Sequence, residues 1–192
     1  MIYPIAVYGH PVLRKTAKEI EPDHEGLSDI IENMWETMYE SDGIGLAAPQ
    51  VNKSIRLIVI DASPLEDDFP ELKDFKKVLI NPEIVDFNED DDIIDEGCLS
   101  LPTIREEVKR PTLITIEYLN SDFNPVTETF HGFAARVVQH EYDHLEGKLF
   151  VDHLSPLKKR LLKGKLNKIS KGDVDVAYKI LTAPLSNKGK RR

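Results

Sequence analysis

Two histidines and a glutamate are spaced so that they can activate water on a metal ion. Residues 140–144 read H-E-Y-D-H, an H-E-x-x-H pattern in a run with helical character from Gly132 to Gly147. On a helix, residues four apart share a face, so His140 and His144 can present two imidazoles to one divalent metal. Glu141 can then take a proton from water beside that metal. Such a metal needs a third protein ligand, which must come from elsewhere in the sequence.

The third ligand is absent at the spacings of common metalloproteases. One class continues the motif to a third histidine, but that position is Phe150, which cannot ligate. Another class uses a glutamate from a later helix, and no glutamate follows Glu146. Asp152 and His153 are conceivable ligands, although their spacing matches neither class. A lone cysteine is more often a small buried hydrophobe, but beside an incomplete metal motif the only cysteine, Cys98, is the better candidate.

A glycine-rich segment adds a third motif. Residues 43–50 read G-I-G-L-A-A-P-Q, which alone indicates only a turn of small residues. Residues 96–100 read E-G-C-L-S and precede the H-E-Y-D-H segment. In this order the three resemble peptide deformylase, whose motifs are G-x-G-L-A-A-x-Q, E-G-C-x-S and H-E-x-D-H. The resemblance extends from about Tyr8 to about Leu166 and includes the P-V-L-R opening at 11–14.

The resemblance implies a reaction and the residues that perform it. Deformylases remove the formyl group from the N-terminal formylmethionine of newly synthesised polypeptides and release formate. Three metal ligands are implied, namely Cys98, His140 and His144. Water on the metal would be the nucleophile, with Glu141 as general acid and base. The Gln50 side-chain amide and the Leu99 backbone N–H would donate to the oxygen that becomes negative.

The resemblance also implies where the formylmethionyl peptide binds. Its backbone would pair as an added strand with the loop Gly43-Ile44-Gly45. The methionine side chain would enter an apolar pocket at positions matching Ile44, Ile94, Phe133 and Val137, with Glu96 at the edge. These apolar residues are also compatible with ordinary core. Arg105 matches an arginine near the substrate backbone, and a surface role fits it nearly as well.

Two motif residues have less defined roles. Arg136 stands where many relatives of the resembled family are apolar, so the shape of the pocket is open at this position. Asp143 belongs to the H-E-Y-D-H motif, and we expect it to brace the structure. His10 and His24 lie in polar, turn-rich segments and are predicted to be surface residues.

The metal and the partners follow partly from chemistry and partly from the resemblance. A Cys-His₂ site suits zinc, whereas the resemblance implies native Fe²⁺, replaceable by Zn²⁺, Ni²⁺ or Co²⁺. The chain has a net charge of −9, yet after Ser155 Lys and Arg greatly outnumber the two acids Asp173 and Asp175. The resemblance associates this basic C-terminal helix with the ribosome, and a merely solubilising end is the alternative. The clustered charge is thus compatible with RNA contact.

Composition bounds the location and the remaining partners. The single unpaired cysteine fits a reducing cytoplasm. No signal peptide is visible, and no apolar run approaches the roughly 20 residues needed to cross a bilayer. We therefore expect a cytoplasmic protein that does not contact a membrane. We also expect a monomer that does not contact DNA, although the sequence itself does not show the oligomeric state.

The segments around these motifs predict the α+β class. Helices are expected at Leu27–Glu40, from Gly132 to about Leu145, and from Ser155 onward. The last helix has a predicted apolar stripe of Leu157, Leu161, Leu162, Leu166 and Ile169. Strands are expected at residues 56–61, 78–86, 108–111, 113–119 and 126–130. Strands first and the ligand helix last favour short antiparallel sheets around a central helix that carries the H-E-x-x-H motif.

The predicted domain organisation is simple. Residues 1–170 form one catalytic domain, since 192 residues suffice for a single sizeable core. Residues 171–192 are predicted to be a basic, mobile tail. Residues 41–49 read as a loop, and the acidic residues 62–77 read as a surface excursion of unknown relation to the site.

Two other functions use the same motifs. A zinc endopeptidase would share H-E-x-x-H, but Phe150 and the missing later glutamate disfavour it. A structural metal or RNA-binding module would need a metal closed by four protein ligands, and only three good ones are present. Substitution of Glu141 by Gln separates these alternatives, because only a catalytic site would lose turnover while it keeps its metal.

Overall fold

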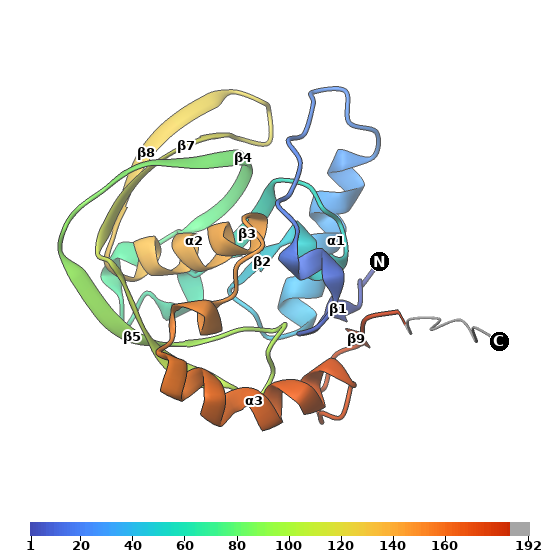
Figure 1. The fold of residues 1–192 in the computed structure, drawn as a ribbon. Helices are drawn as coiled ribbons and strands as arrows, with labels where there is room; N and C mark the ends of the chain where they lie inside the picture. The colour runs from blue at the N-terminus through green and yellow to red at the C-terminus, as the bar shows by residue number, and fades with distance from the viewer. Residues whose placement is uncertain (185–192) are drawn as a thin grey trace.

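The computed structural model describes residues 1–184 and confirms the predicted α+β class. Its three α-helices are α1 (Leu27–Glu40), α2 (Gly132–Leu145) and α3 (Pro156–Ser170). Figure 1 shows α2 near the middle of the molecule, with the strands curving around it and α3 crossing below. The helix that carries both histidines is therefore the central element of the fold.

A five-stranded antiparallel sheet has the order β2-β3-β4-β7-β8. Its strands are β2 (Gly45–Ala47), β3 (Leu57–Asp61), β4 (Lys76–Phe87), β7 (Leu113–Leu119) and β8 (Pro125–His131). A separate antiparallel pair is formed by β5 (Asp91–Gly97) and β6 (Arg105–Pro111). A short parallel pair joins β1 (Ile5–Ala6) to β9 (Ile180–Leu181). The predicted strands are thus present. Four strands were not predicted, namely β1, β5, β9 and β2, the last of which lies inside the predicted loop 41–49.

Apolar packing fixes α2 against the sheet. Ala135, Val137 and Val138 are buried with Ile58 and Ile60 of β3 in one hydrophobic cluster. Burying a valine or isoleucine side chain contributes about 1.5–3 kcal/mol, so several such contacts hold the helix firmly. The opposite side of the sheet is covered by α1, whose Met34 and Met38 are fully buried as the sequence predicts.

Both ends of α2 are defined by particular residues. Glu71, from the acidic segment 62–77, accepts a hydrogen bond of 3.0 Å from the Phe133 N–H. A carboxylate there satisfies a free amide and the positive end of the helix dipole. At the other end Gly147 has φ +68°, the left-handed conformation that commonly follows a helix. The segment 62–77 therefore packs against the body of the protein: Glu71 caps the start of α2, and Leu72 and Phe75 are buried.

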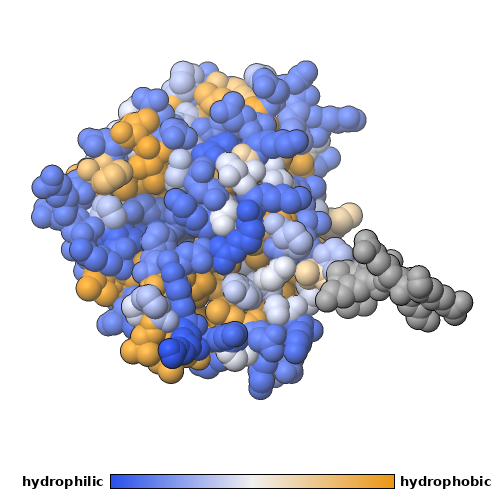
Figure 2. Space-filling model, in the orientation of Figure 1, coloured by the Kyte–Doolittle hydropathy of each residue, from blue (hydrophilic) through white to orange (hydrophobic). Residues whose placement is uncertain are grey.

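The apolar stripe predicted for α3 is only half correct. Leu162, Leu166 and Ile169 are buried, but Leu157 and Leu161 are 66% and 73% exposed. Only one edge of the apolar stripe of α3 packs against the rest of the protein. The other edge faces solvent beside the lysines. Figure 2 shows hydrophobic atoms next to strongly hydrophilic ones over the N-terminal half of α3. His10 was also predicted on the surface, yet it is buried, and its Nδ1 accepts from the Val12 N–H.

The beginning of the predicted tail folds back onto the body. β9 pairs with β1, and the Tyr178 hydroxyl donates to the Leu99 carbonyl at 2.8 Å. The C-terminal segment thereby contacts the loop that follows Cys98. Residues 185–192 of the predicted tail lie outside the described residues. Within residues 1–184, no helix combines the length and apolarity required to span a bilayer.

Candidate metal centre and active site

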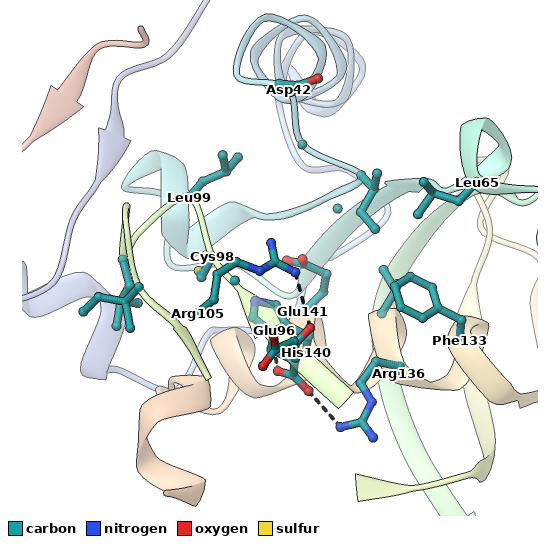
Figure 3. Close-up of a pocket in the computed structure, with 18 of the residues that line it drawn as sticks. Asp42, Leu65, Glu96, Cys98, Leu99, Arg105, Phe133, Arg136, His140 and Glu141 are labelled. Carbon is teal, nitrogen blue, oxygen red and sulfur yellow. Dashed lines mark hydrogen bonds and ion pairs between the residues drawn. The ribbon is translucent and has the colours of Figure 1, made fainter. Parts of the chain in front are cut away.

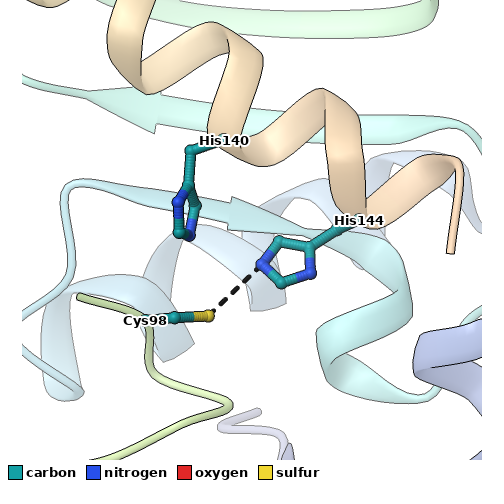
Figure 4. A group of neighbouring side chains, drawn as sticks. All are labelled: Cys98, His140 and His144. Carbon is teal, nitrogen blue, oxygen red and sulfur yellow. Dashed lines mark hydrogen bonds between the residues drawn. The ribbon is translucent and has the colours of Figure 1, made fainter. Parts of the chain in front are cut away.

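Cys98, His140 and His144 converge on one point, as Figure 4 shows. Their sulfur and nitrogen ligand atoms all lie within 4.8 Å of one another, and Cys98 Sγ is 3.3 Å from His144 Nε2. The two histidines stand one helical turn apart on α2, with ring centroids 5.3 Å apart and planes at 80°. A thiolate and two imidazoles form a donor set that suits divalent transition metals, so the structure contains a metal site of one cysteine and two histidines.

Glu96 orients one of these ligands. Its Oε2 lies 2.8 Å from His140 Nδ1, so that nitrogen is occupied and Nε2 is left for a metal. Arg110 binds the same carboxylate in a bidentate manner, through Nε at 2.6 Å and NH2 at 3.0 Å. Burial alone would raise the pKa of Glu96, but the hydrogen bonds from His140 and Arg110 hold it well below its usual range. The group therefore remains a carboxylate that accepts from the histidine.

The thiol of Cys98 is suited to act as a ligand. Burial would raise its pKa, but the nearby His144 and hydrogen bonds from both histidines lower it to about 5. The thiolate is the form of cysteine that ligates metals. The site thus favours the deprotonated sulfur even before a cation contributes.

Glu141 is held beside the ligands without a partner. Its side chain is buried, and among the described residues Oε2 has no hydrogen-bond partner. The pKa of this carboxyl is raised, chiefly because burial removes it from water. A carboxylate with a raised pKa and a free oxygen is typical of a general base that acts near neutral pH.

Gln50 and Leu99 lie at the same site. The Gln50 Oε1 accepts from the Ala47 N–H at 2.8 Å, which turns its Nε2 towards Ser100 Oγ at 3.3 Å and Cys98 Sγ at 3.5 Å. The Leu99 N–H has no acceptor within residues 1–184. Two N–H donors therefore lie next to the cysteine ligand.

Cys98, Leu99, His140 and Glu141 line a cavity of about 580 Å³ (Figure 3), whereas Gln50 and His144 are not among its lining residues. The cavity contains most of the predicted substrate-binding residues, namely Gly43, Ile44, Gly45, Glu96, Arg105, Phe133 and Val137. Ile94 is the exception, because it is absent from the lining and pairs with Val108 in the β5–β6 hairpin. Since β5 alternates its side chains between two faces, Glu96 and Ile94 share one face, but only Glu96 is far enough along the strand to reach the cavity.

The other conceivable ligands have different partners. His153 Nε2 lies 2.7 Å from Asp143 Oδ2, and Asp152 pairs with Arg14. Phe150, at the position of a third histidine in some metalloproteases, is buried and stacks on His140 with centroids 6.1 Å apart. Asp143 also accepts from Arg110 at 2.8 Å, which is a bracing contact of the kind expected.

One part of the site could not be assigned from the motifs. Leu65 lines the cavity, and Phe69 stacks on Phe133 with ring centroids 4.3 Å apart. Both belong to the acidic segment 62–77, which therefore forms one wall of the cavity. The apolar residues Leu65, Phe69 and Leu72, spaced four and three apart among acids, were the available signal.

Comparison with known proteins gives a consistent result. The model of the family "Polypeptide deformylase" matches residues 2–160. A peptide deformylase from Christiangramia forsetii is 51% identical over 187 residues, which cover 94% of this chain and 95% of that protein. The crystal structure of a peptide deformylase from Legionella pneumophila has a TM-score of 0.79 and 40% identity, covering 90% and 98% of the two chains. A Met-Ala-Ser-bound deformylase from Acinetobacter baumannii has a TM-score of 0.74 and 36% identity, covering 80% and 99%.

Proposed function

The chain belongs to the peptide deformylase family, and we propose that Glu141 and the Cys98 site remove formate from the N-terminal formylmethionine of newly synthesised polypeptides. The observation that carries this proposal is the position of Glu141. Its carboxyl group, whose Oε2 has no hydrogen-bond partner among residues 1–184, lines the same cavity as Cys98 and His140, and His144 lies one turn further along the helix. Base and ligands are thus arranged around one reacting centre.

Cys98, His140 and His144 hold the cation in this proposal. A divalent cation held there supplies Lewis acidity, which lowers the pKa of water from about 15.7 towards 7. Fe²⁺ is proposed as the native ion because the resemblance to the family implies it. Zn²⁺, Ni²⁺ or Co²⁺ should be able to replace it, since one thiolate and two imidazoles are acceptable to all four. Glu96 keeps His140 in the tautomer that this ligation needs.

Glu141 moves the proton. It accepts one from the attacking water and delivers it to the nitrogen that leaves as the free amine. Burial raises the pKa of this carboxyl, which favours uptake of the proton by the group that must later release it. The Gln50 amide and the Leu99 N–H donate to the carbonyl oxygen as it gains negative charge.

The free edge of β2 is proposed to receive the peptide. β2 ends the sheet order and, within residues 1–184, is paired on one side only, with β3, while Gly43, Ile44 and Gly45 line the cavity. A peptide that adds there is bound through its main chain, which tolerates varied sequences. The bound Met-Ala-Ser of the Acinetobacter baumannii relative is the tripeptide that deformylation of formyl-Met-Ala-Ser would leave. The methionine side chain then contacts Ile44, Phe133 and Val137.

The basic helix α3 is proposed to contact the ribosome. Lys159, Arg160 and Lys163 line a second hollow beside Leu166, and Leu157 and Leu161 are exposed on the same helix. Binding through such a surface weakens as salt rises, because counterions compete for phosphates. Co-sedimentation with ribosomes at low and high salt tests this contact. A cytoplasmic monomer is the proposed state of the free enzyme.

The reaction is tested with matched peptides. Formyl-Met-Ala-Ser and acetyl-Met-Ala-Ser differ by a methyl group on the acyl carbon. We expect release of formate from the first and no comparable hydrolysis of the second. Cleavage of internal bonds in unformylated peptides, without formate release, would instead favour the endopeptidase alternative.

A further inference from the structure

Arg136 is a buried arginine beside the metal site. It precedes His140 by four residues on α2 and is 4% exposed. Its NH1 donates to Glu96 Oε1 at 3.0 Å and to the Val108 carbonyl at 2.9 Å. Its NH2 donates to the Asp92 carbonyl at 2.8 Å. One guanidinium therefore bridges α2 to both β5 and β6.

The bridge matters because the hairpin has no place in the main sheet. β5 and β6 form a two-stranded sheet of their own, and Cys98 directly follows β5. His140 and His144, by contrast, belong to α2, which packs on the five-stranded sheet. The distance between the cysteine and the histidines therefore depends on contacts between the hairpin and the helix, in addition to the hydrogen bonds that Gln50 and Tyr178 make to residues 98–100.

One face of α2 makes these contacts. This face carries Arg136 and the residues that follow it by three, four and seven positions, namely Gln139, His140 and Asp143. Residues at these spacings lie on one side of a helix. Gln139 donates to the Pro111 carbonyl at 2.9 Å, and Asp143 accepts from Arg110. Of the four, Arg136 reaches the backbone of both strands and also the carboxylate that orients His140.

Glu96 is fully occupied by this arrangement. Oε1 accepts from Arg110 and Arg136, and Oε2 accepts from Arg110 and lies against His140 Nδ1. Figure 3 shows Arg136 joined to the Glu96 carboxylate below the cavity. With both oxygens held, the carboxylate cannot rotate away from the histidine.

We propose that Arg136 is a positioning residue of the metal centre, which fixes the β5–β6 hairpin against α2 and holds the carboxylate that orients His140. The inference rests on the proposed metal ligands and extends them to the group that sets their spacing. Outer groups of this kind typically change metal affinity by about 10–100-fold when they are removed.

The test uses Arg136→Met, which keeps the length of the side chain and removes its donors, and Arg136→Lys, which keeps the charge. A lysine cannot span Glu96 and both carbonyls, so it should restore only part of the effect. Arg56→Met is the matched control, since Arg56 is also buried and binds a carboxylate and a carbonyl, those of Glu146 and Pro82. Neither of these partners lines the cavity.

Full-length protein is loaded with Co²⁺, and a chelator competes for the metal while the thiolate-to-cobalt absorption is followed. We expect Arg136→Met to bind Co²⁺ about 10–100-fold more weakly with an altered spectrum, and Arg56→Met to lower the melting temperature with unchanged affinity and spectrum. Equal Co²⁺ affinity in Arg136→Met and the parent would overturn the inference, as would an equal loss in Arg56→Met. If the parent itself lacks the thiolate absorption, the proposed ligand set fails instead.

Discussion

The carboxylate of Glu141 lies so close to the backbone of Gly45 that a Cβ at position 45 would be 2.5 Å from Oε1. Glycine is therefore required here by the proximity of the carboxylate. The contact joins the edge strand β2, where we place the peptide, to the residue that we propose as its proton carrier. The position of the base is thus tied to the position of the substrate.

Gly45→Ala should disable the enzyme because the new methyl group displaces Glu141. We expect formate release to fall by about 10²–10⁴, the usual range for loss of a general base. Gly164→Ala is the control, since no atom of the described residues lies within 4 Å of a Cβ there. In the middle of α3 this substitution should stabilise the protein by about 0.5–1 kcal/mol. Full activity in Gly45→Ala would show that Glu141 tolerates displacement.

Gln50→Ala removes one of the two proposed donors to the developing oxyanion. We expect kcat to fall by about 10²–10³ with little change in bound metal. Ser100→Ala removes a neighbour that accepts from Gln50 at 3.3 Å and serves as the control, with a much smaller expected effect. Steady-state kinetics and elemental analysis of both variants provide the measurement. A Gln50→Ala variant with parental kcat would contradict the role.

Tyr178→Phe tests the contact of the C-terminal segment with the active-site loop. The lost hydrogen bond to the Leu99 carbonyl should lower the free energy of unfolding by about 0.5–1.5 kcal/mol. Because Leu99 supplies a proposed oxyanion donor, kcat should also fall. Tyr8→Phe is the control, since the Tyr8 hydroxyl has no partner within the described part of the chain. Urea unfolding and formate release that match the control would argue against the contact.

The contribution of Asp61 to the free energy of unfolding should decrease at acid pH. Burial raises its pKa, but hydrogen bonds from the Ser63 and Tyr39 hydroxyls and the charge of Lys76 outweigh burial and lower it from 3.8. A lowered folded-state pKa means that the contribution is complete above pH 3.8 and is lost as the pH falls below it. The difference in unfolding free energy between the parent and Asp61→Asn should shrink below that pH. A pH-independent difference would refute this assignment.

Much of the site was predictable because local spacing determines it. The four-residue interval of His140 and His144 requires only a helix to bring them together, and the structure provides that helix. The cysteine was harder to assign, since the 41 residues between Cys98 and His140 could place it anywhere. Elimination and resemblance indicated Cys98, and the structure confirms its position beside both histidines.

What the sequence could not supply depends on long-range packing. The three residues of β2 are too few to show the alternating pattern of a strand. They form a strand because they pair with β3. The stripe on α3 predicts which side is apolar, but it does not show how much of that side meets the body, so Leu157 and Leu161 were misassigned. Arg136 was recognised as unusual, while its bonds to Glu96 and two carbonyls depend on the β5–β6 hairpin.

The most direct measurement is formate release from formyl-Met-Ala-Ser by anaerobically purified protein, with Cys98→Ala and Glu141→Gln assayed alongside. We expect formate from the parent and almost none from either variant. Glu141→Gln should keep its metal, whereas Cys98→Ala should lose it. A parent protein that carries Fe²⁺ and releases no formate would contradict the account, and so would a Glu141→Gln variant with parental turnover.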